Sequence, residues 1–334
     1  MKDLKAAVIG TGGAARLHMA AYVGGEHTRL VGVCSRDRGR AGKFAGDFGA
    51  RGYASVEEML RVEQPDVVSV ATLEWDHEEP VLRALDAGCH VLCEKVMAHE
   101  IAIGEWMVAA ARRAETSLGV NYNYRSVPSH RLIKQELERG RFGRPALFSA
   151  HMHAYLWPHM LDLMRYFFGD PVEVTGAIVD DQAMRPPVST ASGRPWEFAA
   201  GAEMLYHPSV AVAATFRYAE PDFVATMSGS ALVPLEQNFW SFALYGTEDA
   251  VVINTATRAN LNGVASLGWV AERIARLPAC SYEESFELSV GSFVEAVLAG
   301  KAVPVTGEDG LAEMRLDAAI VEAIRTGRAV AFSG

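Results

Sequence analysis

Residues 10–15 read Gly10-Thr11-Gly12-Gly13-Ala14-Ala15, a G-x-G-x-x-A turn. An apolar stretch at residues 5–10 predicts a strand leading into the turn, and a helical pattern at residues 14–22 follows it. In this context the first glycine allows a tight turn, the second lets a pyrophosphate approach the backbone, and the final small residue lets the helix pack closely on the strand. The turn therefore predicts a dinucleotide-binding domain. The expected cofactor contacts within it are Gly10, Gly12, Gly13 and Ala14.

Strand and helix patterns alternate outward from this turn. Short apolar runs separated by helical patterns predict a parallel, doubly wound sheet, because parallel strands need a crossover helix between them. The run at residues 66–72 (DVVSVAT) is β-branched and apolar, as in strands that are buried on both faces. A Ser55-x-x-Glu58 capping box marks the start of one helix. Further strands are expected at residues 29–34 and 90–93. A helix is expected to follow the first of these strands and to end at about residue 48, and further helices are expected at residues 79–87 and 100–116.

The rhythm changes after about residue 122. Strand-like segments then follow one another with short turns, which favours one mostly antiparallel sheet. With 334 residues, two domains are expected. We predict an α/β protein with a Rossmann domain over residues 1–120 and a substrate-binding and oligomerisation domain over residues 121–334. In the second domain, strands are expected at residues 146–153, 172–179, 197–206, 210–218, 223–229, 239–245 and 250–254, helices at residues 128–140, 158–168, 286–299 and 309–326, and a Pro-, Ser- and Gly-rich loop at residues 185–195.

The composition is that of an acidic globular protein. Half of the residues are hydrophobic and the net charge is −10, so nucleic acids and anionic membranes, which bind basic patches, are not expected as partners. No apolar run reaches the length of a membrane span, and the first residues show no signal-peptide pattern. The four cysteines suggest no disulfide framework. A cytoplasmic location is the expectation that follows.

The end of the second predicted strand bears on the choice of cofactor. An acidic residue there commonly binds the adenosine ribose, but this chain has Ser35 and then Arg36. A serine and an arginine can bind a 2′-phosphate that an acid would repel, so we expect NADP to be favoured over NAD. In the alternative interpretation, Arg36 stacks on adenine and Asp37 binds the ribose, which would allow NAD.

Further motifs extend this interpretation to nearly the whole chain. Residues 84–95 read ALDAGCHVLCEK, and the first turn ends in Ala15-Arg16-Leu17-His18. Together these segments resemble the Gfo/Idh/MocA family of sugar and cyclitol oxidoreductases, with residues 84–95 as the most specific part. The resemblance continues at residues 121–125 (NYNYR), at His159-x-x-Asp162 and at residues 304–310 (PVTGEDG).

The resemblance implies a Rossmann domain followed by an α/β domain whose large, mostly antiparallel open sheet builds a homodimer or homotetramer. It also implies hydride transfer between a nicotinamide cofactor and a secondary alcohol or ketone of a sugar, polyol or cyclitol. Oxidation of an alcohol needs a group that takes the hydroxyl proton. Lys95 stands at the family's strand-end lysine, and His159 matches its acid/base histidine. Thr72, His77 and Glu94 are the further cofactor contacts expected.

The sequence departs from the family pattern beside both catalytic candidates. Val96 replaces the proline that follows the lysine, which favours a trans peptide bond and would shift Lys95. Tyr155 replaces an aspartate four residues before His159, so a carboxylate that could orient the histidine is absent. Tyr155 or His153 is expected to supply a hydrogen bond in its place. We therefore include Tyr155 among the catalytic candidates.

Other residues are candidates for contacting the substrate. Tyr124 and Arg125 follow the sixth strand, and Arg125 is equally suited to a structural hinge. Trp157 offers a stacking surface for a sugar ring, although a lone Trp more often belongs to a core. His151 and His153 alternate along a strand and so point to one face, but the resemblance supplies no metal and none is expected. The expected substrate contacts are Lys95, Tyr124, Arg125, His153 and Trp157.

Two other functions are compatible with these residues. The departures at Val96 and Tyr155 would suit a non-catalytic dinucleotide-binding sensor or regulatory protein. The same fold also supports glycoside hydrolysis that uses NAD. The oxidoreductase is the function we expect. Its substrate is not predictable from the sequence, because loops near Tyr155, residues 185–196 and Phe239 would determine it.

Overall fold

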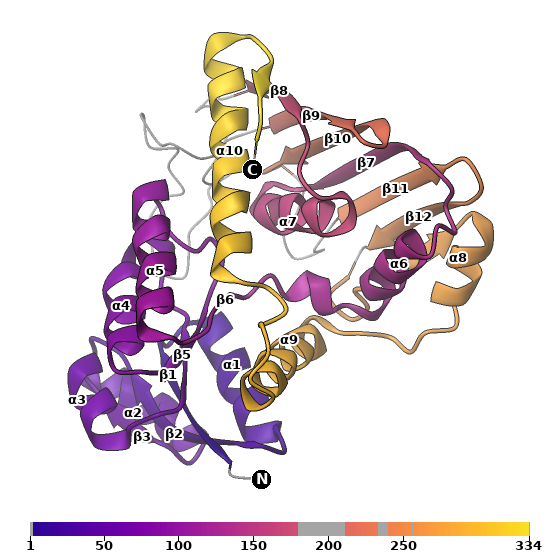
Figure 1. Ribbon diagram of the computed structural model, residues 1–334. Helices are drawn as coiled ribbons and strands as arrows, with labels where there is room; N and C mark the ends of the chain where they lie inside the picture. The colour runs from indigo at the N-terminus through magenta and orange to yellow at the C-terminus, as the bar shows by residue number, and fades with distance from the viewer. Residues whose placement is uncertain (1–2, 180–210, 233–239, 256, 334) are drawn as a thin grey trace. The chain divides into compact units, whose positions relative to one another are not determined.

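The computed structural model describes residues 3–179, 211–232, 240–255 and 257–333 (Figure 1). Contacts divide the chain into two compact units, Met1–Asn123 with Phe286–Ala312, and Tyr124–Ser285 with Glu313–Gly334. The expected division at residue 120 assigns residues 286–312 to the second domain, whereas they pack with the first unit. The reason is that Phe293 and its apolar neighbours enter the core of the first sheet.

The first unit contains one sheet of six parallel strands in the order β3-β2-β1-β4-β5-β6 (Figure 1). This confirms the predicted doubly wound sheet. The order reverses between β1 and β4, and ligands of such sheets bind at the carboxyl ends of the strands beside that point. The strands are β1 (Leu4–Ile9), β2 (Thr28–Cys34), β3 (Arg51–Tyr53), β4 (Val67–Val70), β5 (His90–Cys93) and β6 (Leu118–Val120).

Helices connect these strands, and two of them begin at side-chain caps. The Ser55 hydroxyl accepts the backbone N–H of Glu58 at the start of α3, as the capping box predicts. Asp37 accepts the N–H of Arg40 in the same way at the start of α2. The helices of this unit are α1 (Gly13–Gly24), α2 (Arg38–Asp47), α3 (Val56–Glu63), α4 (Glu78–Asp86), α5 (Ile101–Ala114) and most of α9 (Tyr282–Leu298), with the short turn η1 (Glu74–Asp76).

The second unit is built on an eight-stranded sheet in the order β13-β12-β11-β7-β10-β9-β8-β14. It is mostly antiparallel, as predicted. The exception is the pair β7 and β10, which run parallel. The strand expected at residues 197–206 and the loop expected at residues 185–195 lie outside the described residues. The strands are β7 (Pro145–His153), β8 (Glu173–Val179), β9 (Ala211–Ala219), β10 (Asp222–Ser230), β11 (Trp240–Gly246), β12 (Ala250–Thr255), β13 (Val264–Ser266) and β14 (Val330–Ala331).

Helices cover one face of this sheet (Figure 1). Residues alternate between buried and outward positions along β9 and β10, so side chains such as Phe216 and Phe223 join a core with Trp157. Leu147 and Val224 lie on the opposite, exposed side. The helices are α6 (Pro128–Glu138), α7 (Trp157–Phe168), α8 (Gly268–Ile274), which the sequence did not indicate, and the larger part of α10 (Gly307–Thr326). The short turns η2 (Asn123–Ser126) and η3 (Ala154–Leu156) precede α6 and α7.

Candidate functional site

The glycine turn after β1 has two different kinds of glycine. Gly10 has a φ of +129°, and a Cβ on it would lie 2.3 Å from the carbonyl oxygen of Ala71. The sharp turn against β4 therefore requires glycine. A Cβ on Gly12 or Gly13, in contrast, would meet no atom within 4 Å in the described part of the chain. The space in front of these two glycines is open for a ligand to approach the backbone.

The N-terminus of α1 fits the pyrophosphate of a dinucleotide. Its N-cap is Gly12, which has no side chain to cap the helix, and no acidic residue lies in its first turn. The first N–H groups of a helix have no partner within the helix, and together with the helix dipole they attract phosphate. Ala14 lies in this first turn, and Ala15 is fully buried against the strand. The cofactor contacts expected at the turn are thus in a suitable environment.

Two side chains that follow β2, those of Ser35 and Arg40, contact the glycine turn. The Thr11 hydroxyl donates to Ser35 Oγ at 3.3 Å, and the guanidinium of Arg40 donates to the Thr11 carbonyl at 2.8 Å. The Arg36 side chain is 87% exposed and pairs with Asp76 at 3.2 Å. Arg40 was not identified as a site residue from the sequence. Its spacing of four residues from Arg36, across the start of a helix, was the available signal.

Thr72 and His77, the two cofactor contacts expected after β4, make hydrogen bonds within the protein. The Thr72 hydroxyl donates to the Asp76 carbonyl at 3.1 Å and so closes the η1 turn. His77 is fully buried, and its Nδ1 lies 3.1 Å from the Val96 carbonyl oxygen and 3.2 Å from that of Met97. Burial lowers the pKa of His77. A direct cofactor contact does not fit this interior position, and His77 instead holds the segment that follows Lys95.

The peptide bond between Lys95 and Val96 is cis. The expectation of a trans bond, based on the loss of proline, was wrong. The surroundings fix this segment: the Val96 side chain is buried, and its carbonyl faces His77. Lys95 lies just after the end of β5, and its side chain is half-buried.

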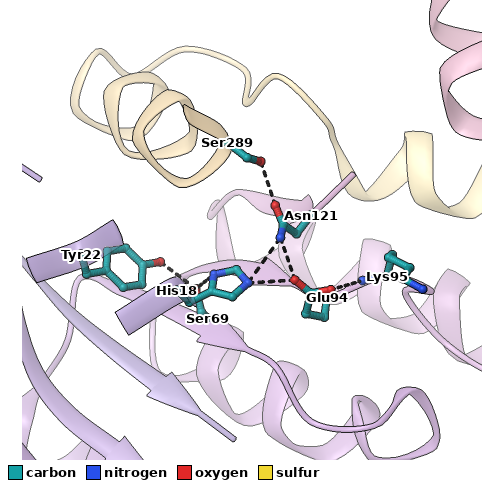
Figure 2. Close-up of polar contacts among 7 residues, drawn as sticks. All are labelled: His18, Tyr22, Ser69, Glu94, Lys95, Asn121 and Ser289. Carbon is teal, nitrogen blue, oxygen red and sulfur yellow. Dashed lines mark hydrogen bonds and ion pairs between the residues drawn. The ribbon is translucent and has the colours of Figure 1, made fainter. Parts of the chain in front are cut away.

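A chain of buried hydrogen bonds surrounds Glu94, the residue before Lys95 (Figure 2). His18 Nε2 lies 2.9 Å from Glu94 Oε1, and Asn121 Nδ2 lies 2.6 Å from the same oxygen. The other carboxylate oxygen accepts the backbone N–H of Lys95 at 3.3 Å. These hydrogen bonds form one network, to which three strand ends and two helices contribute. Its members are Tyr22, Ser69, His18, Glu94, Lys95, Asn121 and Ser289.

The hydrogen bonds can all be directed toward the carboxylate. An ionised carboxylate only accepts, so the His18 Nε2–H and the Asn121 amide both donate to it. Ser289 donates to Asn121 Oδ1 at 2.8 Å, which turns the amide nitrogen toward Glu94. On the other side, Ser69 Oγ lies 2.9 Å from His18 Nδ1. Burial by itself raises the pKa of Glu94, but the hydrogen bond and charge of His18, the hydrogen bond from Asn121 and the charge of Lys95 outweigh it and lower the pKa.

In the second unit, His159 lies in the first turn of α7 and is buried. Its ring stacks on that of Tyr124, with the ring centroids 4.5 Å apart and the planes 20° from parallel. Tyr124 is itself buried. The structure thus brings together a predicted catalytic residue and a predicted substrate contact, and the stacking fixes the plane of the imidazole.

Arg125 is held by Asp162, the aspartate three residues after His159. Its Nε and Nη2 groups donate to the two carboxylate oxygens at 2.8 and 2.6 Å, and its guanidinium lies over the ring of Tyr166. Both members of the ion pair are nearly buried. The contact ties the η2 turn to α7, which fits the hinge interpretation of Arg125 rather than substrate binding.

The remaining candidates lie at or near the end of β7. His153 is buried, and its Nδ1 accepts the N–H of Tyr155 at 3.0 Å, which caps the η3 turn. Tyr155 is half-buried. Trp157 is fully buried in the core of the unit, and its indole N–H donates to Asp317 at 3.0 Å. A stacking surface for a sugar does not fit Trp157, because no face of its ring reaches solvent. His151 is exposed and pairs with Ser228 at 2.6 Å, so the two histidines do not share one environment.

Within the described ranges, no group of three or more His, Cys, Asp or Glu side chains is arranged to hold a metal ion. No helix in that same part of the chain combines the length and the apolar character needed to cross a membrane.

Comparison with known proteins gives consistent matches. The model of an oxidoreductase family with an NAD-binding Rossmann fold (GFO_IDH_MocA) matches residues 4–122. The chain is 27% identical to 1,5-anhydro-D-fructose reductase of Ensifer adhaerens, across 92% of this chain and 91% of the relative. It is 25% identical to inositol 2-dehydrogenase 3 of Saccharopolyspora erythraea, across 98% and 95%. A solved structure of levoglucosan dehydrogenase with NADH and levoglucosan has the same fold, with a TM-score of 0.82 at 20% identity over 99% of this chain and 100% of that one.

Proposed function

The chain belongs to the Gfo/Idh/MocA family of oxidoreductases, and on this premise we propose that it transfers hydride between a nicotinamide cofactor and a sugar, polyol or cyclitol. The reacting group is a secondary alcohol or the corresponding ketone. Two relatives that match over almost their whole lengths support this substrate class, since they are named as a reductase of an anhydro-sugar and a dehydrogenase of inositol.

The position of Lys95 is the observation that carries the proposal. Lys95 follows β5 at the carboxyl edge of the sheet, and the Gly10 turn follows β1 at the same edge, because all six strands are parallel. On such sheets the nicotinamide half of a dinucleotide lies on the β4 and β5 side. An ammonium group there can hold a substrate hydroxyl and assist the loss of its proton. The nicotinamide, when bound, supplies the hydride acceptor or donor.

In the second unit we assign proton exchange to His159, because an imidazole gains and loses a proton near neutral pH. Tyr124 keeps the ring of His159 in one plane. Tyr155 and His153 supply polar contacts for the substrate near the start of α7. Arg125 and Trp157, which are held by buried aspartates, support these groups and do not contact the substrate.

Two pairs of variants test these roles on a panel of sugars, polyols and cyclitols with oxidised NAD and NADP. Lys95→Met is compared with Lys301→Met, an exposed lysine, and His159→Asn with His151→Asn, which changes an exposed histidine on the sheet. We expect kcat to fall by about 10²–10⁴-fold in the two active-site variants, with the Kd of the cofactor close to that of the parent. The two control variants keep the parent kcat.

Other outcomes would assign a different function. Tight dinucleotide binding with no turnover across the panel would favour the sensor or regulatory protein. Release of a sugar from an aryl glycoside, with NAD needed only in catalytic amount, would identify a glycosidase. Equal loss of activity in His159→Asn and His151→Asn would remove the assigned role of His159.

For the cofactor itself, we propose a preference for NADP over NAD. Ser35, Arg36 and Arg40 place a hydroxyl and two guanidinium groups at the end of β2, where an adenosine 2′-phosphate would bind. The carboxylate of Asp37 caps α2, which disfavours the alternative in which it binds the ribose. Titration of the protein with both oxidised cofactors is the test. A lower Kd for NADP is expected, and a lower Kd for NAD would reverse the assignment.

We also propose that the open face of the second sheet joins copies of this chain into a homodimer or homotetramer. Val224, Leu147 and Tyr245 are opposite one another on β10, β7 and β11, and each is more than a third exposed. Such a row of apolar side chains is typical of an interface. Light scattering of the parent protein and of Leu147→Glu tests this. An oligomer that dissociates in the variant is expected, whereas a monomeric parent would contradict the proposal.

A further inference from the structure

Glu94 is one of the cofactor contacts expected from the sequence, and its carboxylate is the centre of a buried polar network in the first unit. The network joins residues far apart in the sequence: His18 is 76 positions from Glu94, and Ser289 is 168 positions from Asn121. His18 is fully buried, and Glu94 is 7% exposed. Burying a carboxylate is costly unless donors satisfy it, so the arrangement of donors requires an explanation.

The donors keep Glu94 in its ionised form. Its Oε1 receives hydrogen bonds from His18 and Asn121, and its Oε2 receives the N–H of Lys95. A protonated carboxyl would have to donate its own hydrogen toward one of these donors and would lose a bond. Ser289 holds the amide of Asn121 so that its nitrogen faces Glu94. The rings of Phe286 and His18 pack in a T-shaped arrangement, with their centroids 5.5 Å apart.

The charge lies at a particular place on the sheet. Glu94 follows β5, on the side of β1 opposite to β2. The cofactor's adenosine half belongs to the β2 side, where Ser35 lies, and its nicotinamide half to the β4 and β5 side. The oxidised nicotinamide ring carries a positive charge and the reduced ring carries none. Glu94 contributes one negative charge here beside the positive charges of His18 and Lys95, and removing that charge acts on the oxidised ring and not on the reduced ring.

We propose that the network of Tyr22, Ser69, His18, Asn121 and Ser289 holds Glu94 as a permanent anion, and that this anion strengthens the binding of oxidised over reduced nicotinamide cofactor. The inference rests on the proposed function, since it requires that the site binds a nicotinamide dinucleotide. In this role Glu94 is a residue that tunes the cofactor by its charge, and His18 and Asn121 are positioning residues that act through it.

The test compares the Kd of the oxidised and the reduced form of the same dinucleotide, measured by calorimetry and by the fluorescence of the reduced form. Glu94→Gln keeps the shape and removes the charge. We expect it to raise the ratio of Kd for the oxidised form to Kd for the reduced form about 10-fold or more over the parent. Glu63→Gln is the matched control: Glu63 is a carboxylate of the same unit that pairs with Arg51 and the Tyr53 hydroxyl, and its loss leaves the ratio unchanged.

A second variant covers the case in which Glu94→Gln does not fold. Asn121→Ala removes one donor from Oε1 and retains Glu94, and it should move the ratio in the same direction by a smaller factor. Variants that bind both forms with the parent ratio would overturn the inference while leaving the proposed function intact. A folded parent protein that binds neither form would instead overturn the proposed function, and the inference with it.

Discussion

Arg125 and Asp162 form a two-pronged ion pair, with Nε–Oδ2 and Nη2–Oδ1 distances of 2.8 and 2.6 Å. Only 10% of the arginine side chain and 1% of the aspartate side chain are exposed. The pair joins the start of the second unit to α7, the helix that carries His159. It therefore anchors the second turn of α7, while His159 in the first turn stacks on the ring of Tyr124.

Removing the Asp162 charge should destabilise the protein strongly. Asp162→Asn leaves a buried guanidinium without its counter-charge, and we expect a loss of about 3–5 kcal/mol in the free energy of unfolding. Glu173→Gln is the control, because the pair of Glu173 with Arg217 is 3.5 Å long and about half exposed, and should contribute less than about 1 kcal/mol. Denaturant unfolding of both variants is the measurement. Similar losses in the two would contradict the assigned importance of burial.

The two kinds of glycine in the first turn predict opposite effects of the same substitution. Gly10→Ala places a Cβ against the Ala71 carbonyl at a φ that favours glycine, and should cost about 3 kcal/mol or more of stability. Gly12→Ala meets no described atom and should keep the parent melting temperature. It should instead raise the Kd of the dinucleotide about 10-fold or more, because the methyl group occupies the path of the pyrophosphate.

Thermal unfolding and cofactor titration of the two glycine variants distinguish these effects. If Gly12→Ala unfolded at a lower temperature and still bound the cofactor normally, the open space in front of this glycine would not be the cofactor site.

His130 should make the protein sensitive to acid. It is buried beside Trp240, its Nδ1 donates to the Tyr124 carbonyl at 2.8 Å, and burial lowers its pKa from 6.5 to about 4. The unfolded chain takes up a proton as the pH falls below 6.5, but the folded chain does not until about pH 4. The free energy of unfolding is therefore highest above pH 6.5 and falls by about 3 kcal/mol as the pH drops to 4.

The comparison for this prediction is His130→Gln, which carries no titratable ring. Its stability at neutral pH should be lower than that of the parent, but it should fall less between about pH 7 and about pH 4. Unfolding curves at several pH values measure the two slopes. Parallel slopes would show that His130 is not responsible for the acid sensitivity.

His77 should affect stability and turnover without affecting cofactor affinity. His77→Leu removes the hydrogen bonds to the carbonyls of Val96 and Met97, which hold the segment after Lys95. A loss of about 1–3 kcal/mol of stability is expected, together with a lower kcat and an unchanged cofactor Kd. A rise in the cofactor Kd with normal stability would restore the direct contact that the sequence predicted.

The sequence by itself determined the features that depend on near neighbours along the chain. The Gly10–Ala15 turn, the alternation of strands and helices, and the Ser55 cap were all predictable, because each reflects a spacing within one strand, turn or helix. Lys95 and His159 were proposed from motifs of the same local kind. The parallel, doubly wound sheet was predicted from the alternation, whereas its strand order comes from the structure.

Only the tertiary structure decided which distant residues meet. His18, Glu94, Asn121 and Ser289 form one network because three strand ends and two helices pack together, and no local pattern records that packing. The interior positions of His77 and Trp157 were decided in the same way. A side chain's burial and hydrogen bonds depend on every element packed around it, whereas a sequence pattern reports only the element to which the residue belongs.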